Sequence, residues 1–413
     1  MSGEPMSYVM HDLETTAPLA PLVVPPAATG YALVLRRHGR VVGFLMNEAS
    51  GGTVIEPAEL ASIIAAEAGT KLLEEIISEE LKGDRPRSVE AMPSLTIAIC
   101  TKDRSVRLQR CLASLLPQIE RGRSEGQAIE VLVVDNAPSD DRTREVAAAL
   151  AGVRYALEPR PGLDFARNRA LSAAEGDWIA FLDDDVVVDR GWLSGLREAW
   201  AENPDAGAFT GLVLPYELAT PSQIIFERRG GFRRGFDKIR YGTSYPANPL
   251  YPCASGIFGA GCNMAFRRDA MMALGGFDEA LDTGAPLPGG GDLDAFFRIV
   301  RAGHVLAYEP QLLVYHEHRR EMPALRRQYW SWGLGCMAFL VKCYHADPPV
   351  RPIILRFLAW WIKYQIKESL RSFRRNGPPI SMVFAEIWGG IAGIGGEYAR
   401  SKRRIERIKQ AYP

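Results

Sequence analysis

Several features are scarce or missing in this chain of 413 residues. The six cysteines include no C-x-x-C pair, the spacing typical of zinc and redox sites. No run of ~18 apolar residues occurs, so we expect no membrane-spanning helix. The first residues show no basic start followed by an apolar stretch, so we predict no signal peptide and a cytoplasmic location. The composition, 47% hydrophobic and 24% charged, excludes a disordered or collagen-like chain.

The chain also has no net charge, but its charges are unevenly distributed. It contains 49 Lys and Arg and 49 Asp and Glu in total. From Glu321 to Pro413 there are 16 basic and 6 acidic residues, a charge of +10 that the preceding residues balance with −10. A basic tail on an acidic body suggests contact with an anionic surface, either lipid headgroups or nucleic acid. No nucleic-acid motif accompanies the tail, and its tryptophans lie beside lysines, which favours a membrane interface.

Composition and patterning divide the chain into four segments. We predict a flexible, Pro-rich leader over 1–30 and a small N-terminal α+β domain with a linker over 31–92. Within 31–92, Gly39 should turn a hairpin and Pro57 should open a helix that runs to about Leu81. An α/β domain should occupy 93–320, and a basic, Trp-rich helical region should occupy 321–413.

The segment 93–320 alternates between short apolar runs and helical patterns. We expect strands at 95–100, 131–134 and 179–182, with helices at 108–116 and 142–150. This alternation predicts a parallel α/β sheet, whose ligands bind beyond the carboxyl ends of the strands. Polar clusters follow each of these strands, so the sequence places a binding site at that edge.

Three consecutive carboxylates end one apolar strand, at Asp183, Asp184 and Asp185. Neighbouring negative charges repel and raise one another's pKa unless a cation neutralises them. Oxygen ligands of this kind suit Mg²⁺ or Mn²⁺, which are usually held together with substrate phosphates. A solvated acidic turn is the alternative explanation.

Further segments carry candidate binding groups. Asp135 ends another apolar strand and could accept hydrogen bonds from a base or ribose. The segment 162–169 opens a helix with two arginines, a pattern suited to nucleotide phosphates. The segment 289–294 places Asp292 in a glycine-rich loop before a helix, and His316 and His318 follow a late apolar strand.

The ordered set of these segments resembles the family 2 glycosyltransferases, whose nucleotide-sugar-binding fold is called GT-A. The resemblance runs from about Pro93 to Arg319 and implies an α/β fold of the GT-A type with flanking helices. Among such enzymes, the chain is similar to bacterial ones that build surface polysaccharides or glycolipids and carry a similar small N-terminal domain. The resemblance implies a nucleotide-diphosphate sugar as donor and a saccharide or lipid-linked acceptor.

The family pattern also implies roles for individual residues. It assigns donor binding to Thr101, Asp103, Arg104, Asp135, Arg167, Asp183 and Asp184. It assigns the divalent metal, Mn²⁺ or Mg²⁺, to Asp185, with His316 as a further ligand. His316 could equally be a structural histidine.

The resemblance makes Asp292 the catalytic base, which would remove the proton of the acceptor hydroxyl. A base on one face and a metal-bound leaving group on the other imply a single displacement with inversion. The sequence departs from the family at Gly291, where relatives carry a glutamate linked to acceptor positioning. Segments 226–236 and 259–264 are expected to form an acceptor loop and the sugar pocket, with a surface loop and a structural turn as the alternatives.

The C-terminal segment should contain an amphipathic helix at 352–375. An apolar stripe (Ile362, Ile366, Leu370 and Phe373) lies beside a basic one (Lys363, Lys367, Arg371 and Arg374). This pattern predicts a helix lying in a membrane interface, and hence a peripheral protein on the inner membrane face. A helix that packs between domains is the alternative.

Two other functions fit parts of the sequence. A sugar nucleotidyltransferase would share the fold and metal carboxylates, but it usually has a glycine-rich loop after the first strand, where this chain has Thr101 to Arg104. A non-catalytic binding protein with a GT-A-like fold would explain Gly291. The retained Asp292 and the aspartate triplet favour the enzyme.

Overall fold

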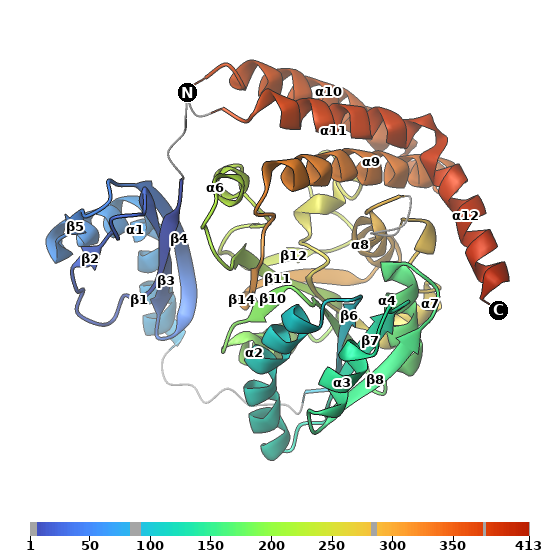
Figure 1. The fold of residues 1–413 in the computed structure, drawn as a ribbon, viewed down its shortest axis with the longest axis horizontal. Coiled ribbons are helices and arrows are strands. Elements are labelled where there is room, and N and C mark those ends of the chain that lie inside the picture. Colours follow the sequence, from blue (N-terminus) through green and yellow to red (C-terminus); the bar gives the residue numbers. More distant parts are fainter. Residues whose placement is uncertain (1–5, 83–91, 282–286, 375–376, 413) are drawn as a thin grey trace.

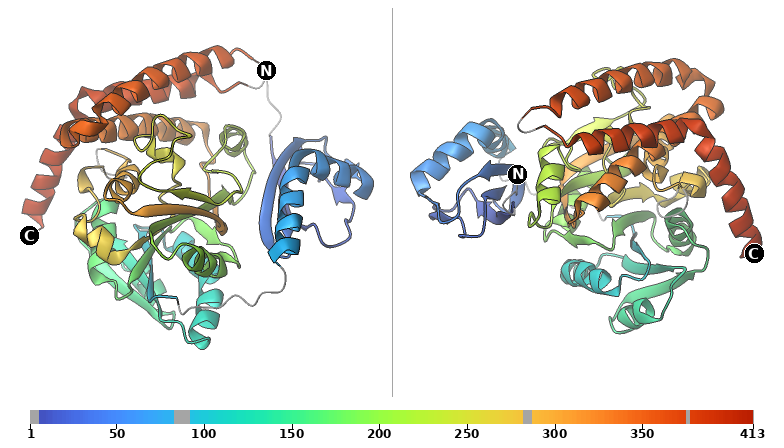
Figure 2. Two further views of the ribbon diagram at one scale, coloured as in Figure 1. Left: turned by 180° about the vertical axis from the view of Figure 1, so that it is seen from behind. Right: turned by 45° about the horizontal axis from the view of Figure 1, so that its top comes forward.

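The computed structural model describes residues 6–82, 92–281, 287–374 and 377–412. They form an N-terminal unit, a central sheet covered by helices, and a layer of C-terminal helices (Figure 1). Figure 2 shows the N-terminal unit beside the central sheet, with the C-terminal helices along another side of it. The predicted linker falls on residues 83–91, which lie outside the described part.

The N-terminal unit packs one helix against a three-stranded sheet, β1-β3-β4, and also contains a two-stranded sheet, β2-β5. Its elements are β1 (Tyr8–Glu14), β2 (Leu22–Val23), β3 (Gly30–Arg37), β4 (Arg40–Glu48), β5 (Val54–Ile55) and α1 (Pro57–Lys82). The predicted hairpin is confirmed as β3 and β4, which pair antiparallel. Gly39 turns this hairpin with a φ of 77°, a conformation that glycine adopts without steric cost. Leu33 and Leu35 of β3 pack on Leu60 and Ile64 of α1.

The prediction of a flexible leader over 1–30 is wrong for residues 6–30. Strand β1 pairs in parallel with β3, from Tyr8 opposite Gly30 to Glu14 opposite Arg36. The prolines of this segment lie after β1, where the chain turns back towards β3. The proline content therefore correctly indicated a non-regular connection between β1 and β3. It did not indicate β1 itself, which is ordered by its pairing with β3.

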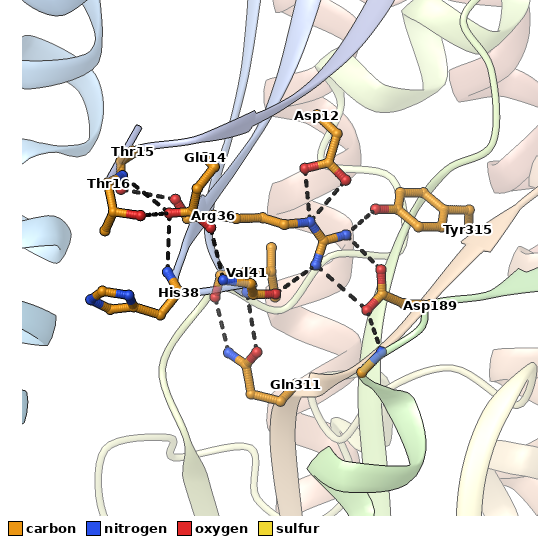
Figure 3. A network of polar contacts seen from close by, with 12 residues as sticks. Asp12, Glu14, Thr15, Thr16, Arg36, His38, Val41, Asp189, Gln311 and Tyr315 are labelled. Carbon is orange, nitrogen blue, oxygen red and sulfur yellow. Dashed lines mark hydrogen bonds and ion pairs between the residues drawn. The ribbon is translucent and has the colours of Figure 1, made fainter. Parts of the chain in front are cut away.

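A buried arginine joins the N-terminal unit to the central sheet (Figure 3). Arg36 of β3 donates from Nε to Asp12 at 2.8 Å, and from Nη2 to Asp189 at 2.5 Å and Tyr315 at 2.8 Å. Beside it, Gln311 exchanges two hydrogen bonds with the backbone of Val41. Buried charges of this kind are stable only when paired, so the network fixes how the two parts dock.

The central sheet has the strand order β10-β14-β11-β13-β9-β6-β7-β8, with β12 pairing to β14. The strands are β6 (Leu95–Thr101), β7 (Ile129–Asn136), β8 (Val153–Glu158), β9 (Trp178–Asp183), β10 (Val186–Val188), β11 (Ala206–Pro215), β12 (Ile239–Tyr241), β13 (Asn263–Arg267) and β14 (Val305–His316). Strands β7, β6 and β9 are parallel, as predicted, and β8, which was not predicted, pairs with β7 in parallel. The sheet as a whole is mixed, because β13 runs antiparallel to both β9 and β11. A short apolar run predicts a strand but not its direction.

Helices cover both faces of this sheet (Figure 1). They are α2 (Ser105–Ser124), α3 (Arg142–Ala148), α4 (Leu163–Ala173), α5 (Trp192–Glu202), α6 (Pro221–Arg228), α7 (Arg268–Ala273) and α8 (Gly291–Arg301). Successive strand residues point to opposite faces. Ile97 and Ile99 of β6 therefore join the core beneath α2 and α5, whereas Ala98 packs on the side of α4 and α8.

The C-terminal layer consists of α9 (Met322–Ala346), α10 (Arg351–Arg371), α11 (Ile380–Ala392) and α12 (Tyr398–Ala411). Short helical turns occur at Ser255–Ile257, Glu279–Leu281, Pro348–Val350 and Gly393–Glu397. Helix α9 packs on α8, where Phe339 contacts Phe297, and α10 and α11 lie outside it (Figures 1 and 2). The helix predicted over 352–375 corresponds to α10, and Arg375 lies outside the described part. Among the described helices, none has the length and apolar character needed to span a membrane.

Candidate functional site

The candidate site lies where the strand order changes direction. From β6, the chain adds β7 and β8 on one side and then β9 on the other. In such sheets, ligands bind beyond the carboxyl ends of the strands at this switch point. Thr101 at the end of β6 pairs with Asp135 of β7, and Cys100 pairs with Asp183 of β9. The backbone therefore brings three of the predicted site residues to one edge.

The middle aspartate of the triplet is held by the end of β6 and the start of α2. Thr101 Oγ1 donates to Asp184 Oδ2 at 2.6 Å, and Arg104 Nη1 donates to Asp184 Oδ1 at 3.2 Å. Burial raises the pKa of Asp184, although these two donors oppose the shift. Through Asp184, the candidate donor-binding residues Thr101 and Arg104 are both bonded to the triplet.

The last aspartate of the triplet faces His316. Asp185 Oδ1 lies 3.3 Å from His316 Nε2 and makes no hydrogen bond within the described residues. This proximity follows from the pairing of β10 with β14, in which Val186 lies opposite His316. Burial lowers the pKa of His316 to about 4, so the ring is neutral at pH 7 and can offer a lone pair.

The donor set at this edge suits a divalent cation. Ligand atoms of Asp183, Cys262 and His316 lie within 4.8 Å of one another. Burial, together with the charge of Asp185, raises the pKa of Asp183 to about 7. Burial would also raise the pKa of Asp185, but His316 and Arg104 outweigh it and lower that pKa. A partly buried and a buried carboxylate, Asp183 and Asp185, that compete for charge beside a neutral imidazole fit Mg²⁺ or Mn²⁺.

A second layer of side chains holds His316. His316 Nδ1 lies 3.3 Å from His318 Nδ1, and His318 Nε2 lies 2.7 Å from Glu227 Oε1 of α6. Phe232 packs edge-on against His316. Partners of this kind fix the orientation of a metal-binding histidine.

The nucleoside side of the site contains Asp135 and Asp103. Asp135 is fully buried and accepts a hydrogen bond from Tyr155 at 3.0 Å, and its burial raises its pKa. Asp103 is exposed and accepts the N–H of Ser139 at 2.8 Å. Of these two carboxylates, Asp135 therefore lies in the protein interior and Asp103 lies at the surface.

Asp292, at the start of α8, lies near a buried arginine, Arg167. Its Oδ2 accepts the N–H of Gly261 at 3.1 Å, and its Oδ1 accepts the N–H of Leu293 at 2.9 Å. Burial would lower the pKa of Arg167, but Asp164, Asp183 and Asp292 outweigh it and raise that pKa. Arg167 therefore lies among carboxylates from α4, β9 and α8.

The structure adds residues that the sequence analysis did not assign. Glu227 lay in a segment treated as a loop, although α6 extends to Arg228. Arg107 and Arg110 of α2 each contact Glu317 at 2.6 Å. Their i, i+3 spacing was a visible signal, because it places both arginines on one face of the helix.

Comparisons with known proteins relate this chain to glycosyltransferases. Residues 96–275 match the sequence model of glycosyl transferase family 2. The pre-mycofactocin glycosyltransferase of Mycobacterium tuberculosis is 25% identical over 374 residues, covering 87% of this chain and 72% of that protein. The succinoglycan biosynthesis protein ExoM of Rhizobium meliloti is 27% identical over 250 residues, covering 58% of this chain and 72% of that protein.

A solved structure shows a similar fold. It is the mannosyltransferase PcManGT of Pyrobaculum calidifontis, with a TM-score of 0.50 and 16% identity, covering 81% of this chain and 97% of that one. The predicted GT-A type of α/β fold is thereby confirmed. The chain therefore carries a domain over residues 96–275 that matches glycosyl transferase family 2.

Proposed function

We propose that the chain transfers a sugar from a nucleotide-diphosphate donor to a hydroxyl acceptor, with a divalent metal and with inversion at the anomeric carbon. One observation carries the proposal. Asp183, Asp185 and His316 lie close together at the ends of their strands, and the charge of Arg167 acts on both Asp183 and Asp292. The polysaccharide-related relative ExoM supports a role in polysaccharide or glycolipid assembly.

The donor half of the proposal rests on the ends of β6, β7 and β9. Asp135 and Asp103 would accept hydrogen bonds from a base and ribose, and Thr101 and Arg104 donate to Asp184. Asp185 and His316, with Asp183 beside them, would hold the metal. A bound divalent cation would stabilise the charge that develops on the leaving diphosphate. The mannosyltransferase of similar fold was solved with GDP-Man and Mn²⁺, which supports this donor class.

The acceptor half rests on Asp292. Two backbone N–H groups fix its carboxylate at the start of α8. We propose that this carboxylate takes the proton of the acceptor hydroxyl as the oxygen attacks the anomeric carbon. A single displacement in which Asp292 acts on the face of the sugar away from the leaving diphosphate would invert the configuration.

A binding panel tests the donor assignment. Purified protein is titrated by calorimetry with UDP, GDP and dTDP sugars, in Mn²⁺, in Mg²⁺ and in EDTA. We expect one nucleotide class to bind in Mn²⁺ and to lose most of its affinity in EDTA. If no sugar nucleotide binds with either Mn²⁺ or Mg²⁺, the proposed function is wrong.

We further propose that α10 and α11 rest on an anionic membrane surface. Ile366 and Leu370 of α10 are 57% and 66% exposed, and Trp388 of α11 is 64% exposed. Lys363 and Lys367 lie beside this apolar face. Large exposed apolar side chains next to basic ones are typical of helices that lie in the lipid interface.

Vesicle binding tests the membrane proposal. The Lys363→Glu/Lys367→Glu protein should bind vesicles containing phosphatidylglycerol at least ~10-fold more weakly than wild type, because each basic residue near such a surface contributes about 1 kcal/mol. The matched control is Arg121→Glu/Arg190→Glu, which reverses two exposed charges in the central domain. Equal sedimentation of all three proteins with these vesicles would refute a role for α10.

A further inference from the structure

The backbone at Gly291 leaves no room for a side chain. A Cβ atom at this position would lie 2.0 Å from Oδ2 and 2.8 Å from Cγ of Asp164. Both distances are shorter than any real Cβ contact. The space that a glutamate at 291 would enter is therefore filled by a carboxylate from helix α4.

Asp164 cannot easily leave this position. Its side chain is 1% exposed, and its Oδ1 accepts a hydrogen bond from Arg167 Nη1 at 3.0 Å. The guanidinium of Arg167 lies over the ring of Phe277, 5.3 Å from its centroid, and is itself 7% exposed. Moving Asp164 would separate a buried ion pair, which is strongly unfavourable.

Arg167 connects this carboxylate to the proposed base. A Cβ atom at Gly261 would lie 3.1 Å from Arg167 Nη2 and 3.1 Å from Asp292 Oδ2, so the two atoms border the same small space. The other carboxylate in the first turn of α8, Asp294, is engaged elsewhere. It contacts Arg298 at 2.6 Å and Lys342 at 2.7 Å.

We infer that Asp164 supplies, from α4, the acidic group that the family resemblance leads one to expect at position 291 beside the base. In this role it is a positioning residue, which holds Arg167 and prevents the guanidinium from pairing with Asp292. Asp292 then remains able to accept a proton. The inference rests on the proposed function and assigns the missing acidic group to α4, far from Gly291 in the sequence.

A double-mutant cycle tests this assignment. Asp164→Asn, Asp164→Ala, Gly291→Glu and Asp164→Ala/Gly291→Glu are compared with wild type by release of nucleoside diphosphate from the donor that the wild type binds. Donor affinity is measured by calorimetry and folding by circular dichroism. Gly69→Glu is the control, because a Cβ atom at that position of α1 meets nothing within 4 Å.

We expect Asp164→Asn to lower kcat at least 10-fold while the donor dissociation constant changes less than 3-fold. A merely structural defect would lower binding capacity and turnover together. Gly291→Glu should be inactive, and the double variant should recover at least 10-fold over Asp164→Ala. Wild-type kcat in Asp164→Asn, or a double variant no better than Asp164→Ala, overturns the inference. If the wild type turns over no sugar nucleotide, the proposed function itself fails and this inference falls with it.

Discussion

The Asp292→Asn enzyme will bind its sugar nucleotide with nearly wild-type affinity but transfer the sugar about 10²–10⁴ times more slowly. Asparagine keeps the shape of the side chain, and its oxygen can still accept one of the backbone N–H groups that hold Asp292. It cannot accept the proton of the acceptor hydroxyl. The loss should therefore appear in kcat, which a coupled assay of nucleoside diphosphate release measures.

The control for this variant is Asp269→Asn. Asp269 also lies in the first turn of a helix, α7, but its side chain is 69% exposed and pairs with Arg267. We expect wild-type kcat from this protein. A kcat for Asp292→Asn within a few-fold of wild type would show that another group acts as the base.

Asp185→Asn should abolish the metal dependence of donor binding and lower kcat/KM by about 10³-fold, since a bound cation contributes several kcal/mol of transition-state stabilisation. Asp185 is buried against His316, so the isosteric change removes the charge proposed to bind the metal without opening a cavity. Mn²⁺ affinity, followed by calorimetry, should fall in parallel with kcat/KM. The thermal unfolding midpoint in EDTA is measured to show that the protein remains folded.

Asp177→Asn is the matched control for this variant. Asp177 directly precedes β9, whereas Asp185 follows the other end of that strand, and Asp177 is exposed. It should leave Mn²⁺ affinity unchanged. If Asp185→Asn bound Mn²⁺ and donor as wild type does, the metal would have to lie elsewhere.

Local patterns in the sequence predicted the elements that build the site. Apolar runs predicted β6, β7 and β9, and their polar ends met at one edge because parallel strands share a direction. The aspartate triplet and His316 were recognisable as candidate ligands by residue type. The distance of 3.3 Å between Asp185 and His316 depends on the pairing of β10 with β14, which a single sequence does not show.

Features that depend on distant contacts could not be predicted. Strand β1 is ordered by its pairing with β3, and the docking of the N-terminal unit depends on Arg36 reaching Asp189 and Tyr315. From the sequence, the glycine at 291 suggested that the carboxylate implied by the family resemblance had been lost. The physical reason for this glycine is the Asp164 carboxylate, which α4 brings to the start of α8.

The most direct test of the central claim is the time course of nucleoside diphosphate release by the wild-type protein from the sugar nucleotide that it binds. The assay is run with Mn²⁺, with Mg²⁺ and with EDTA. The account predicts release in at least one of the two metals, none in EDTA, and recovery when the metal is restored. Release at the same rate in EDTA, or no release under any condition from a donor that binds, would contradict metal-dependent sugar transfer at this site.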